Sequence, residues 1–281
     1  MHTAVLRFPL TVKSVNTELA ALSNQQTFTQ QPILCLHGWL DNAASFAPLA
    51  PFLASEQLLA LEFPGHGHSP HRSFDAHYYF FDWVHDLVAL CQTQQWQNLT
   101  IIGHSMGGMV ATALAAAFPE LVSRLILIDS LGFITDKADN AAKQLRDGIH
   151  SRLKAVTRTP RYATLQEAAA ARQRQSDFDM AQALLLAERG TEQTEHGFQW
   201  RADLRLRHSS VYRMTEQQAV ALISAIACPV LAIMASDSAF ANKAKHYCAY
   251  YTRLQLETVT GGHHCHMTNP ADVAKHIKRF L

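Results

Sequence analysis

From about residue 30 onward, short hydrophobic runs alternate with segments in which hydrophobic residues recur at helical spacing. We predict buried β-strands at 33–36, 58–61, 99–102, 125–128, 230–233 and 254–259. We predict helices at 42–53, where Pro48 and Pro51 limit the regularity, and at 78–91, 109–118 and 271–281. Such alternation indicates an α/β fold with a mostly parallel central sheet flanked by helices. The first 22 residues, with Leu6, Phe8, Leu10 and Val12 alternating, predict an antiparallel start.

The alternation stops between Leu131 and Cys228, where residues 135–215 are helical in pattern. We therefore expect a core made of residues 1–133 and 216–281, interrupted by a helical cap, or lid, at 134–215. An insertion at the carboxyl ends of parallel strands lies where ligands bind in open α/β sheets. The alternative is a solvated helical excursion with no role.

One turn carries the clearest chemical signal. Gly103-His104-Ser105-Met106-Gly107 lies between a predicted strand and an alanine-rich predicted helix. The pattern G-x-S-x-G in this context is the nucleophile elbow of α/β-hydrolases, which exposes a serine hydroxyl on a strained turn. The alternative is a glycine-rich helix start with Ser105 as its N-cap. We predict that Ser105 is a nucleophile.

A serine hydroxyl needs a base within hydrogen-bond reach, and a carboxylate that orients this base. In α/β-hydrolases the chain order is serine, acid, histidine. The segment from Gly261 to His266 follows the last predicted strand, and we predict His263 as the base. His266 is a weaker candidate, and His276 lies inside the final predicted helix.

The same segment, with His263, His264, Cys265 and His266, also contains metal-ligating residue types, as does the cluster of His66, His68 and His71. Adjacent ligands from one short loop rarely satisfy tetrahedral geometry. The second cluster lacks a nearby aspartate of the metallo-hydrolase kind. The sequence therefore predicts neither a metal nor another cofactor.

The acid has two candidates at strand ends. Asp129 follows the strand 125–128, and Asp237 follows the strand 230–233. For each, a turn or capping role is the alternative. An oxyanion hole needs two backbone N–H groups. We expect them from Met106, directly after the serine, and from Trp39 in His37-Gly38-Trp39 behind the first parallel strand, although Trp39 could also be a core anchor.

Several segments together resemble the serine hydrolase-like proteins, a branch of the α/β-hydrolase superfamily. They are 37–43 (HGWLDNA), 63–69 (FPGHGHS), 103–108 (GHSMGG), 125–129 (LILID), 189–191 (RGT) and 262–270 (GHHCHMTNP). The resemblance implies the α/β-hydrolase fold, Ser105 as nucleophile, the backbone of Trp39 and Met106 as oxyanion hole, and His263, seven residues before Pro270, as base.

The acid departs from the superfamily pattern G-x-x-D, because Ala235-Ser236-Asp237-Ser238 lacks the glycine and is one residue out of step. Members with the acid one strand earlier place it where Asp129 stands, so we favour Asp129 over Asp237. The implied activity is that of a serine hydrolase cleaving a small-molecule ester through an acyl-enzyme. The alternatives are a same-triad C–C hydrolase or haloperoxidase, and a non-catalytic binding module on a hydrolase scaffold.

The composition of the chain indicates which partners and which compartment to expect. A formal net charge of +1 gives no basic excess for nucleic-acid binding. We expect no membrane span, because no run of about 18 apolar residues occurs, and no signal peptide in the first residues. Five scattered cysteines favour a reducing compartment, and hence the cytoplasm. Candidate pocket residues in the expected cap are Phe178, Phe198, Trp200 and Arg205, with a packing role as the alternative for each.

Overall fold

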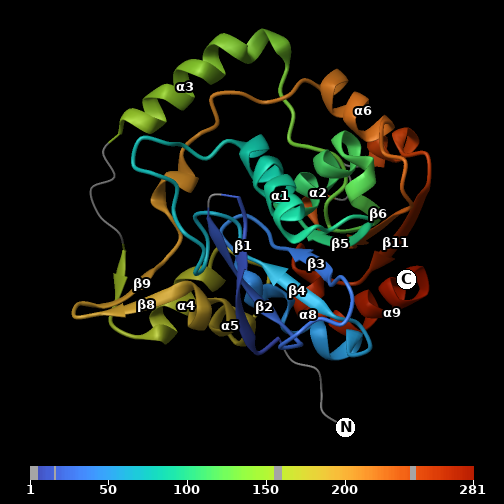
Figure 1. Ribbon diagram of the computed structural model, residues 1–281. Helices are drawn as coiled ribbons and strands as arrows, with labels where there is room; N and C mark the ends of the chain where they lie inside the picture. Colours follow the sequence, from blue (N-terminus) through green and yellow to red (C-terminus); the bar gives the residue numbers. More distant parts are fainter. Residues whose placement is uncertain (1–5, 16, 155–159, 241–244) are drawn as a thin grey trace.

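The computed structural model describes residues 6–15, 17–154, 160–240 and 245–281. Its centre is an eight-stranded sheet in the order β1-β2-β4-β3-β5-β6-β10-β11 (Figure 1). The strands are β1 (Phe8–Lys13), β2 (Glu18–Ser23), β3 (Ile33–Leu36), β4 (Leu58–Leu61), β5 (Leu99–His104), β6 (Val122–Ile128), β10 (Val230–Ala235) and β11 (Leu254–Val259). The six strands from β4 to β11 pair in parallel, whereas β1 and β2 form an antiparallel edge. The predicted fold class is confirmed.

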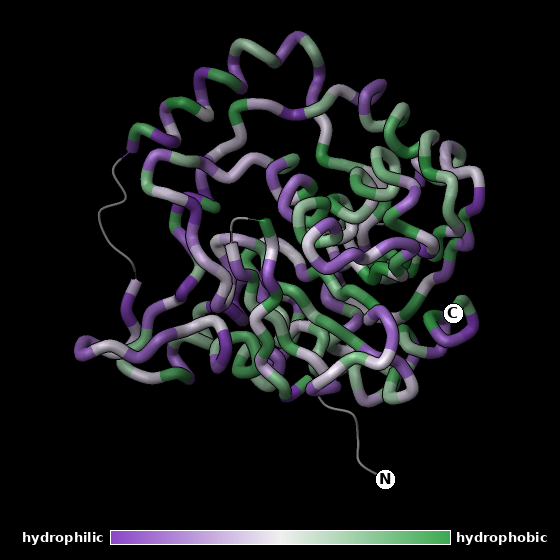
Figure 2. The backbone as a smooth tube through the Cα atoms, in the orientation of Figure 1, coloured by the Kyte–Doolittle hydropathy of each residue, from purple (hydrophilic) through white to green (hydrophobic). Residues whose placement is uncertain are grey.

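The central strands β3 and β4 are buried throughout, which explains why they consist of uninterrupted hydrophobic runs. Figure 2 shows hydrophobic residues along these strands. One core layer packs the sheet against α1 (Phe80–Gln94), α2 (Met106–Ala117) and α6 (Glu216–Ser224). A second layer packs it against α9 (Pro270–Phe280) and two 3₁₀ turns, η1 (Ala43–Phe46) and η2 (Ala50–Leu53). Both faces of the sheet are thereby covered.

The helix predicted at 42–53 is wrong as a continuous helix, because the chain there forms the separate turns η1 and η2. Pro48 and Pro51 account for the break, since proline lacks the N–H that a helix interior requires. Asn42 caps η1 by accepting a hydrogen bond from the Ala44 N–H. The other predicted strands and helices lie within two or three residues of the observed ones.

The segment between β6 and β10 contains the helices α3 (Ala141–Leu153), α4 (Leu165–Gln173) and α5 (Met180–Gly190) and the short turns η4 (Ala138–Asn140) and η5 (Leu204–Arg207). It also contains a three-stranded antiparallel sheet, β7 (Arg161–Tyr162), β9 (Gly197–Trp200) and β8 (Thr191–Thr194), which the helical pattern did not predict. A clear two-residue period is absent because β7 spans only two residues and β8 is polar throughout. Part of the expected cap, residues 155–159, lies outside the described residues.

This inserted segment is fixed to the core through buried polar contacts. Arg189 of α5 makes two hydrogen bonds to Glu62, from Nε at 2.7 Å and from Nη2 at 2.9 Å, and the Glu62 side chain is fully buried. Asn42 donates to the Leu186 carbonyl at 2.9 Å. Among the described residues, no helix is long and apolar enough to cross a membrane.

Candidate active site

Ser105 occupies the turn that connects β5 directly to α2. Its backbone has φ 50° and ψ −120°, a conformation that costs free energy in any residue other than glycine. The helix approaches the neighbouring strand so closely that a Cβ atom on Gly107 would lie 2.2 Å from the Leu36 carbonyl oxygen. Ser130 supports the turn by donating to the Ser105 carbonyl at 2.7 Å. The local sequence therefore forces the strained turn that presents the Ser105 hydroxyl.

Three side chains from distant parts of the chain form a hydrogen-bonded series at this turn. His263 Nε2 lies 2.9 Å from Ser105 Oγ, and His263 Nδ1 lies 2.5 Å from Asp129 Oδ2. When Nδ1–H donates to the buried carboxylate, Nε2 carries the lone pair that accepts the serine proton. A nucleophile, a base and an orienting acid are thus placed in the order that acyl transfer requires.

Asp129 directly follows β6 and is held from several sides. Its own N–H donates to the Ile233 carbonyl at 2.8 Å. Its carboxylate accepts from the Ala235 N–H at 3.1 Å and from the Ser238 hydroxyl at 2.5 Å. The competing candidate Asp237 is exposed and accepts a hydrogen bond from the Ser236 hydroxyl. The structure brings Asp129, not Asp237, to His263.

The two candidate oxyanion donors belong to the start of α2 and to the loop after β3. Met106 is the first residue of α2, where backbone N–H groups have no partner within the helix. Trp39 follows β3 in a tight turn that Asp41 closes by donating to the Gly38 carbonyl. The Trp39 side chain is 47% exposed, so it is not a core anchor; its indole N–H reaches the Leu206 carbonyl of the inserted segment at 3.2 Å.

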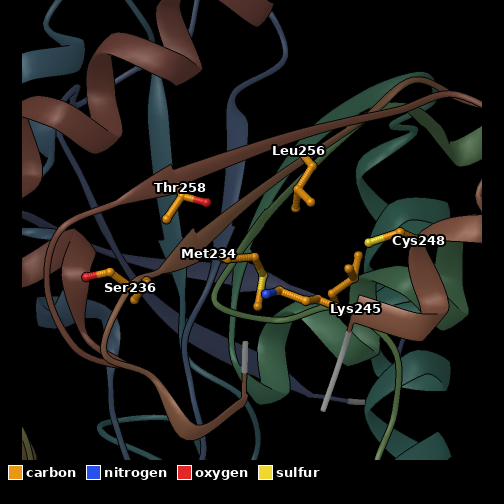
Figure 3. A pocket seen from close by; sticks show the side chains of 8 residues that line it. Met234, Ser236, Lys245, Cys248, Leu256 and Thr258 are labelled. Atoms are coloured by element: carbon orange, nitrogen blue, oxygen red, sulfur yellow. The ribbon is translucent and has the colours of Figure 1, made fainter. Parts of the chain in front are cut away.

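Beside Ser105 lies a cavity of about 360 Å³. Most of its wall is apolar, and one part carries a polar group in which Tyr247 and Thr135 donate to Glu216 at 2.8 and 3.2 Å. The lining residues are Ser105, Met109, Asp129, Ser130, Leu131, Phe133, Ile134, Thr135, Glu216, Phe240, His246 and Tyr247. A smaller cavity of about 120 Å³, in which Met234, Lys245, Cys248 and Leu256 converge, is not lined by Ser105 (Figure 3).

The four candidate pocket residues of the expected cap do not line the cavity beside Ser105. Phe178 instead packs edge-on against His264, with ring centroids 4.8 Å apart. Arg205 pairs with Asp203 at 2.7 Å. The lining residues that sequence reasoning missed, such as Glu216 and Phe240, follow no motif and lie more than 100 residues from Ser105 in the chain. Only the tertiary structure brings them to the serine.

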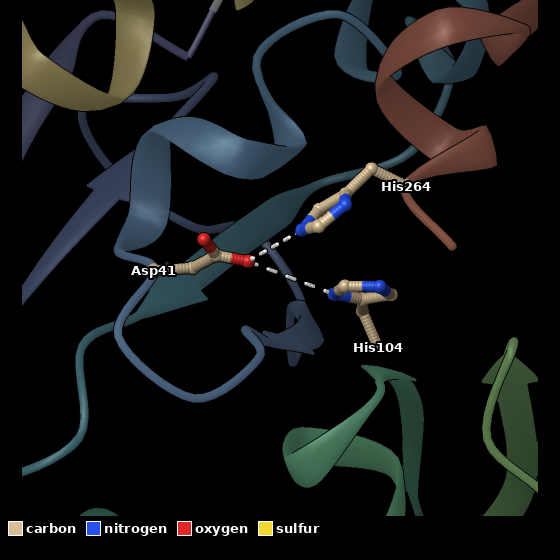
Figure 4. Close-up of side chains that lie close together, drawn as sticks. All are labelled: Asp41, His104 and His264. Carbon is tan, nitrogen blue, oxygen red and sulfur yellow. Dashed lines mark ion pairs between the residues drawn. The ribbon is translucent and has the colours of Figure 1, made fainter. Parts of the chain in front are cut away.

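The histidines of the predicted cluster at residues 66–71 lie in separate surroundings and do not face one common ion. His66 is buried against His37 and Trp83, while His71 reaches the Arg201 carbonyl at the surface. Within the described ranges, three metal-ligating side chains converge at Asp41, His104 and His264, whose ligand atoms lie within 4.8 Å of one another. Figure 4 shows the Asp41 carboxylate facing both imidazoles. The sequence did not predict this grouping.

Charges around this grouping balance without a metal. Burial by itself would lower the pKa of His264, but Asp177 and Asp41 outweigh that effect and raise the pKa to about 9. Burial, reinforced by the neighbouring histidines, holds the pKa of His104 well below its usual value, so His104 is neutral. Two carboxylates are therefore matched by the His264 imidazolium and by Arg172, which contacts Asp41 at 2.6 Å. We assign no metal to these residues.

Comparison with known proteins shows the family to which this chain is related. Residues 31–270 match the sequence pattern of the alpha/beta hydrolase fold family. The chain is 32% identical to a serine hydrolase-like protein of Danio rerio over 89% of its own length and 81% of that protein. It is 30% identical to the human serine hydrolase-like protein 2, over 89% and 86% of the two chains. The crystal structure of a hypothetical protein from Pseudomonas aeruginosa superposes with a TM-score of 0.90 at 35% identity, covering 97% and 98% of the chains.

The chain belongs to the α/β-hydrolase family. Within this family it is a member of the serine hydrolase-like branch, as its resemblance in sequence predicted. A hydrolase activity is supported by this membership.

Proposed function

We propose that the protein is a serine hydrolase that cleaves small carboxylic esters through an acyl-enzyme. The observation that carries the proposal is the series Ser105–His263–Asp129, hydrogen-bonded in that order, beside a largely apolar cavity of about 360 Å³. Such a cavity accommodates a small acyl or alcohol group. Neighbouring polar groups at Glu216 and Tyr247 offer one place for hydrogen bonding to the substrate.

In the first half-reaction, Ser105 Oγ attacks the ester carbonyl carbon while its proton moves to His263 Nε2. The backbone N–H groups of Trp39 and Met106 stabilise the oxyanion that forms. The tetrahedral intermediate then collapses, and the alkoxide leaves with the proton from His263. Throughout, Asp129 keeps the His263 ring oriented and stabilises its positive charge.

In the second half-reaction, His263 removes a proton from water, and the resulting hydroxide attacks the acyl-enzyme. The carboxylic acid leaves, and Ser105 recovers its proton from His263.

We also propose that residues 134–215 act as a cap on a core of residues 1–133 and 216–281. The contacts Arg189–Glu62 and Asn42–Leu186 support this division. We further propose a cytoplasmic setting, because all five cysteines are unpaired.

The Ser105→Ala variant tests the proposal. It should fold with an unchanged melting temperature yet lose at least about 10³-fold in kcat/KM on a p-nitrophenyl ester. A fluorophosphonate probe should label the wild-type protein on Ser105 and leave the variant unlabelled. Wild-type activity in the variant would overturn the hydrolase assignment. Absence of both labelling and turnover in the wild type would favour a non-catalytic binding module.

A further inference from the structure

His264, the residue after the proposed base, is buried and is held by charged side chains from three parts of the chain. Its Nδ1 lies 2.5 Å from Asp177 Oδ1, and its Nε2 lies 3.5 Å from Asp41 Oδ2. Arg172 contacts the other oxygen of Asp41. Asp41 belongs to the loop after β3, His264 to the loop after β11, and Arg172 and Asp177 to the cap. The cap therefore supplies two of the four charges.

Further contacts also hold the residues on either side of His263. Asp177 Oδ2 accepts from the His264 N–H at 3.3 Å. It also lies so close to Gly262 that a Cβ atom there would be 2.1 Å from this oxygen. From the core, His104 Nε2 donates to the His263 carbonyl at 2.9 Å. The loop that carries His263 is thus fixed between the cap and the end of β5.

We propose that His264 is a positioning residue, clamped between Asp41 of the core and Asp177 of the cap, which makes the alignment of His263 with Ser105 depend on a seated cap. This inference rests on the proposed function. A fixed loop matters because a displacement of about 1 Å at a reacting group can cost about 10²-fold in rate. The seating of the cap would then align the proposed base with Ser105.

The groups around His264 define how the clamp responds to pH. Asp41 and Asp177 face its ring nitrogens, Phe178 faces its edge, and the neutral rings of His104 and His266 lie beside it. Burial keeps the pKa of His266 near 3, so His266 does not compete for the proton. Because the pKa of His264 is raised to about 9, the clamp holds at neutral pH and weakens as the pH rises through 9.

Asp177→Asn is the decisive variant, because Asp177 is partly exposed and lies outside the proposed catalytic groups. The readouts are the rate of fluorophosphonate labelling at Ser105 and the kinetics on p-nitrophenyl butyrate. We expect both the labelling rate and kcat to fall on the order of tenfold, with little change in KM. The decline in labelling rate at alkaline pH should begin at a lower pH than in the wild type, because His264 has lost one of its two carboxylates.

Glu192→Gln provides the matched control, since Glu192 is a cap carboxylate of similar exposure that pairs with Arg201 at 3.4 Å, away from His263. It should leave the labelling rate and its pH profile unchanged. Labelling of Asp177→Asn at the wild-type rate and with the wild-type profile would overturn the inference while leaving the hydrolase proposal intact. A failure of the wild type to label would instead overturn the hydrolase proposal.

Cobalt(II) titration of the untagged protein tests the alternative that these residues bind a metal ion. The proposal expects no tetrahedral cobalt spectrum that depends on His264. A one-to-one tetrahedral spectrum in the wild type that disappears in His264→Gln would show a metal ligand in place of an imidazolium clamp, and would overturn the proposal.

Discussion

At the scale of single residues, the proposed chemistry depends on which carboxylate orients His263. Asp129 is completely buried and receives hydrogen bonds from Ala235 and Ser238 in addition to that from His263. These donors stabilise a carboxylate and fix its direction. The exposed Asp237 has neither the position nor the surroundings for this role.

Asp129→Asn should therefore lower kcat by roughly 10³- to 10⁴-fold, because the amide no longer holds the required histidine tautomer. Steady-state kinetics on a p-nitrophenyl ester measure the loss, and the melting temperature should change little. Asp237→Asn is the control and should retain nearly full activity. If the losses were reversed between these two variants, Asp129 would not be the orienting acid.

At the scale of elements, the ion pair of Glu62 and Arg189 joins the end of β4 to α5, because Glu62 directly follows that strand. Glu62 is fully buried and also accepts hydrogen bonds from the N–H groups of Ala43 and His68. Removing one partner of a buried pair leaves an uncompensated charge, which is more damaging than removing both. This contact is therefore expected to control how firmly the cap is attached.

Arg189→Met should lower the free energy of unfolding by about 3–5 kcal/mol, measured by urea denaturation. The double variant Glu62→Gln/Arg189→Met should recover part of that loss, since it removes the unpaired charge. Arg201→Met, which breaks a more exposed cap pair with Glu192, should cost about 1 kcal/mol or less. Equal losses in Arg189→Met and Arg201→Met would show that the Glu62 contact is not a significant attachment.

At the scale of the whole molecule, buried histidines whose pKa values are shifted in opposite directions set the pH at which stability is greatest. The pKa of His264 is raised to about 9, so its contribution is complete below the unfolded value near 6.5 and is lost as the pH rises through 9. Burial, reinforced by nearby histidines, lowers the pKa values of His66 and His266 to about 3. Their contribution to stability is complete above about pH 6.5 and is lost as the pH falls toward 3.

The melting temperature should consequently be highest near pH 6.5–7 and fall on both sides, as measured by calorimetry between pH 4 and 9. His264→Gln should flatten the alkaline side without removing the acidic one. His85→Gln, a substitution of an exposed histidine, should change neither side. A wild-type stability that stays constant from pH 6.5 to 9 would contradict the raised pKa of His264.

The sequence by itself determined the elements and residues whose signals are local. Buried parallel strands need continuous hydrophobic runs, so β3, β4, β5, β6 and β10 were predictable from short windows. The turn at Ser105 is imposed by glycines within a few residues of it. The spacing of His263 from Pro270 is likewise contained in one segment.

Only the tertiary structure decided which distant groups meet. Asp129 and Asp237 follow neighbouring strands, so the strand pattern left both candidates open. The resemblance favoured Asp129, but the contact of its carboxylate with His263 is visible only in the folded chain. The sheet of the cap and the cavity wall were missed because short strands and long-range contacts leave no period in the sequence. The clamp on His264 was missed for the same reason: Asp41, Asp177 and His264 are separated by 136 and 87 residues and meet only when the cap packs on the core.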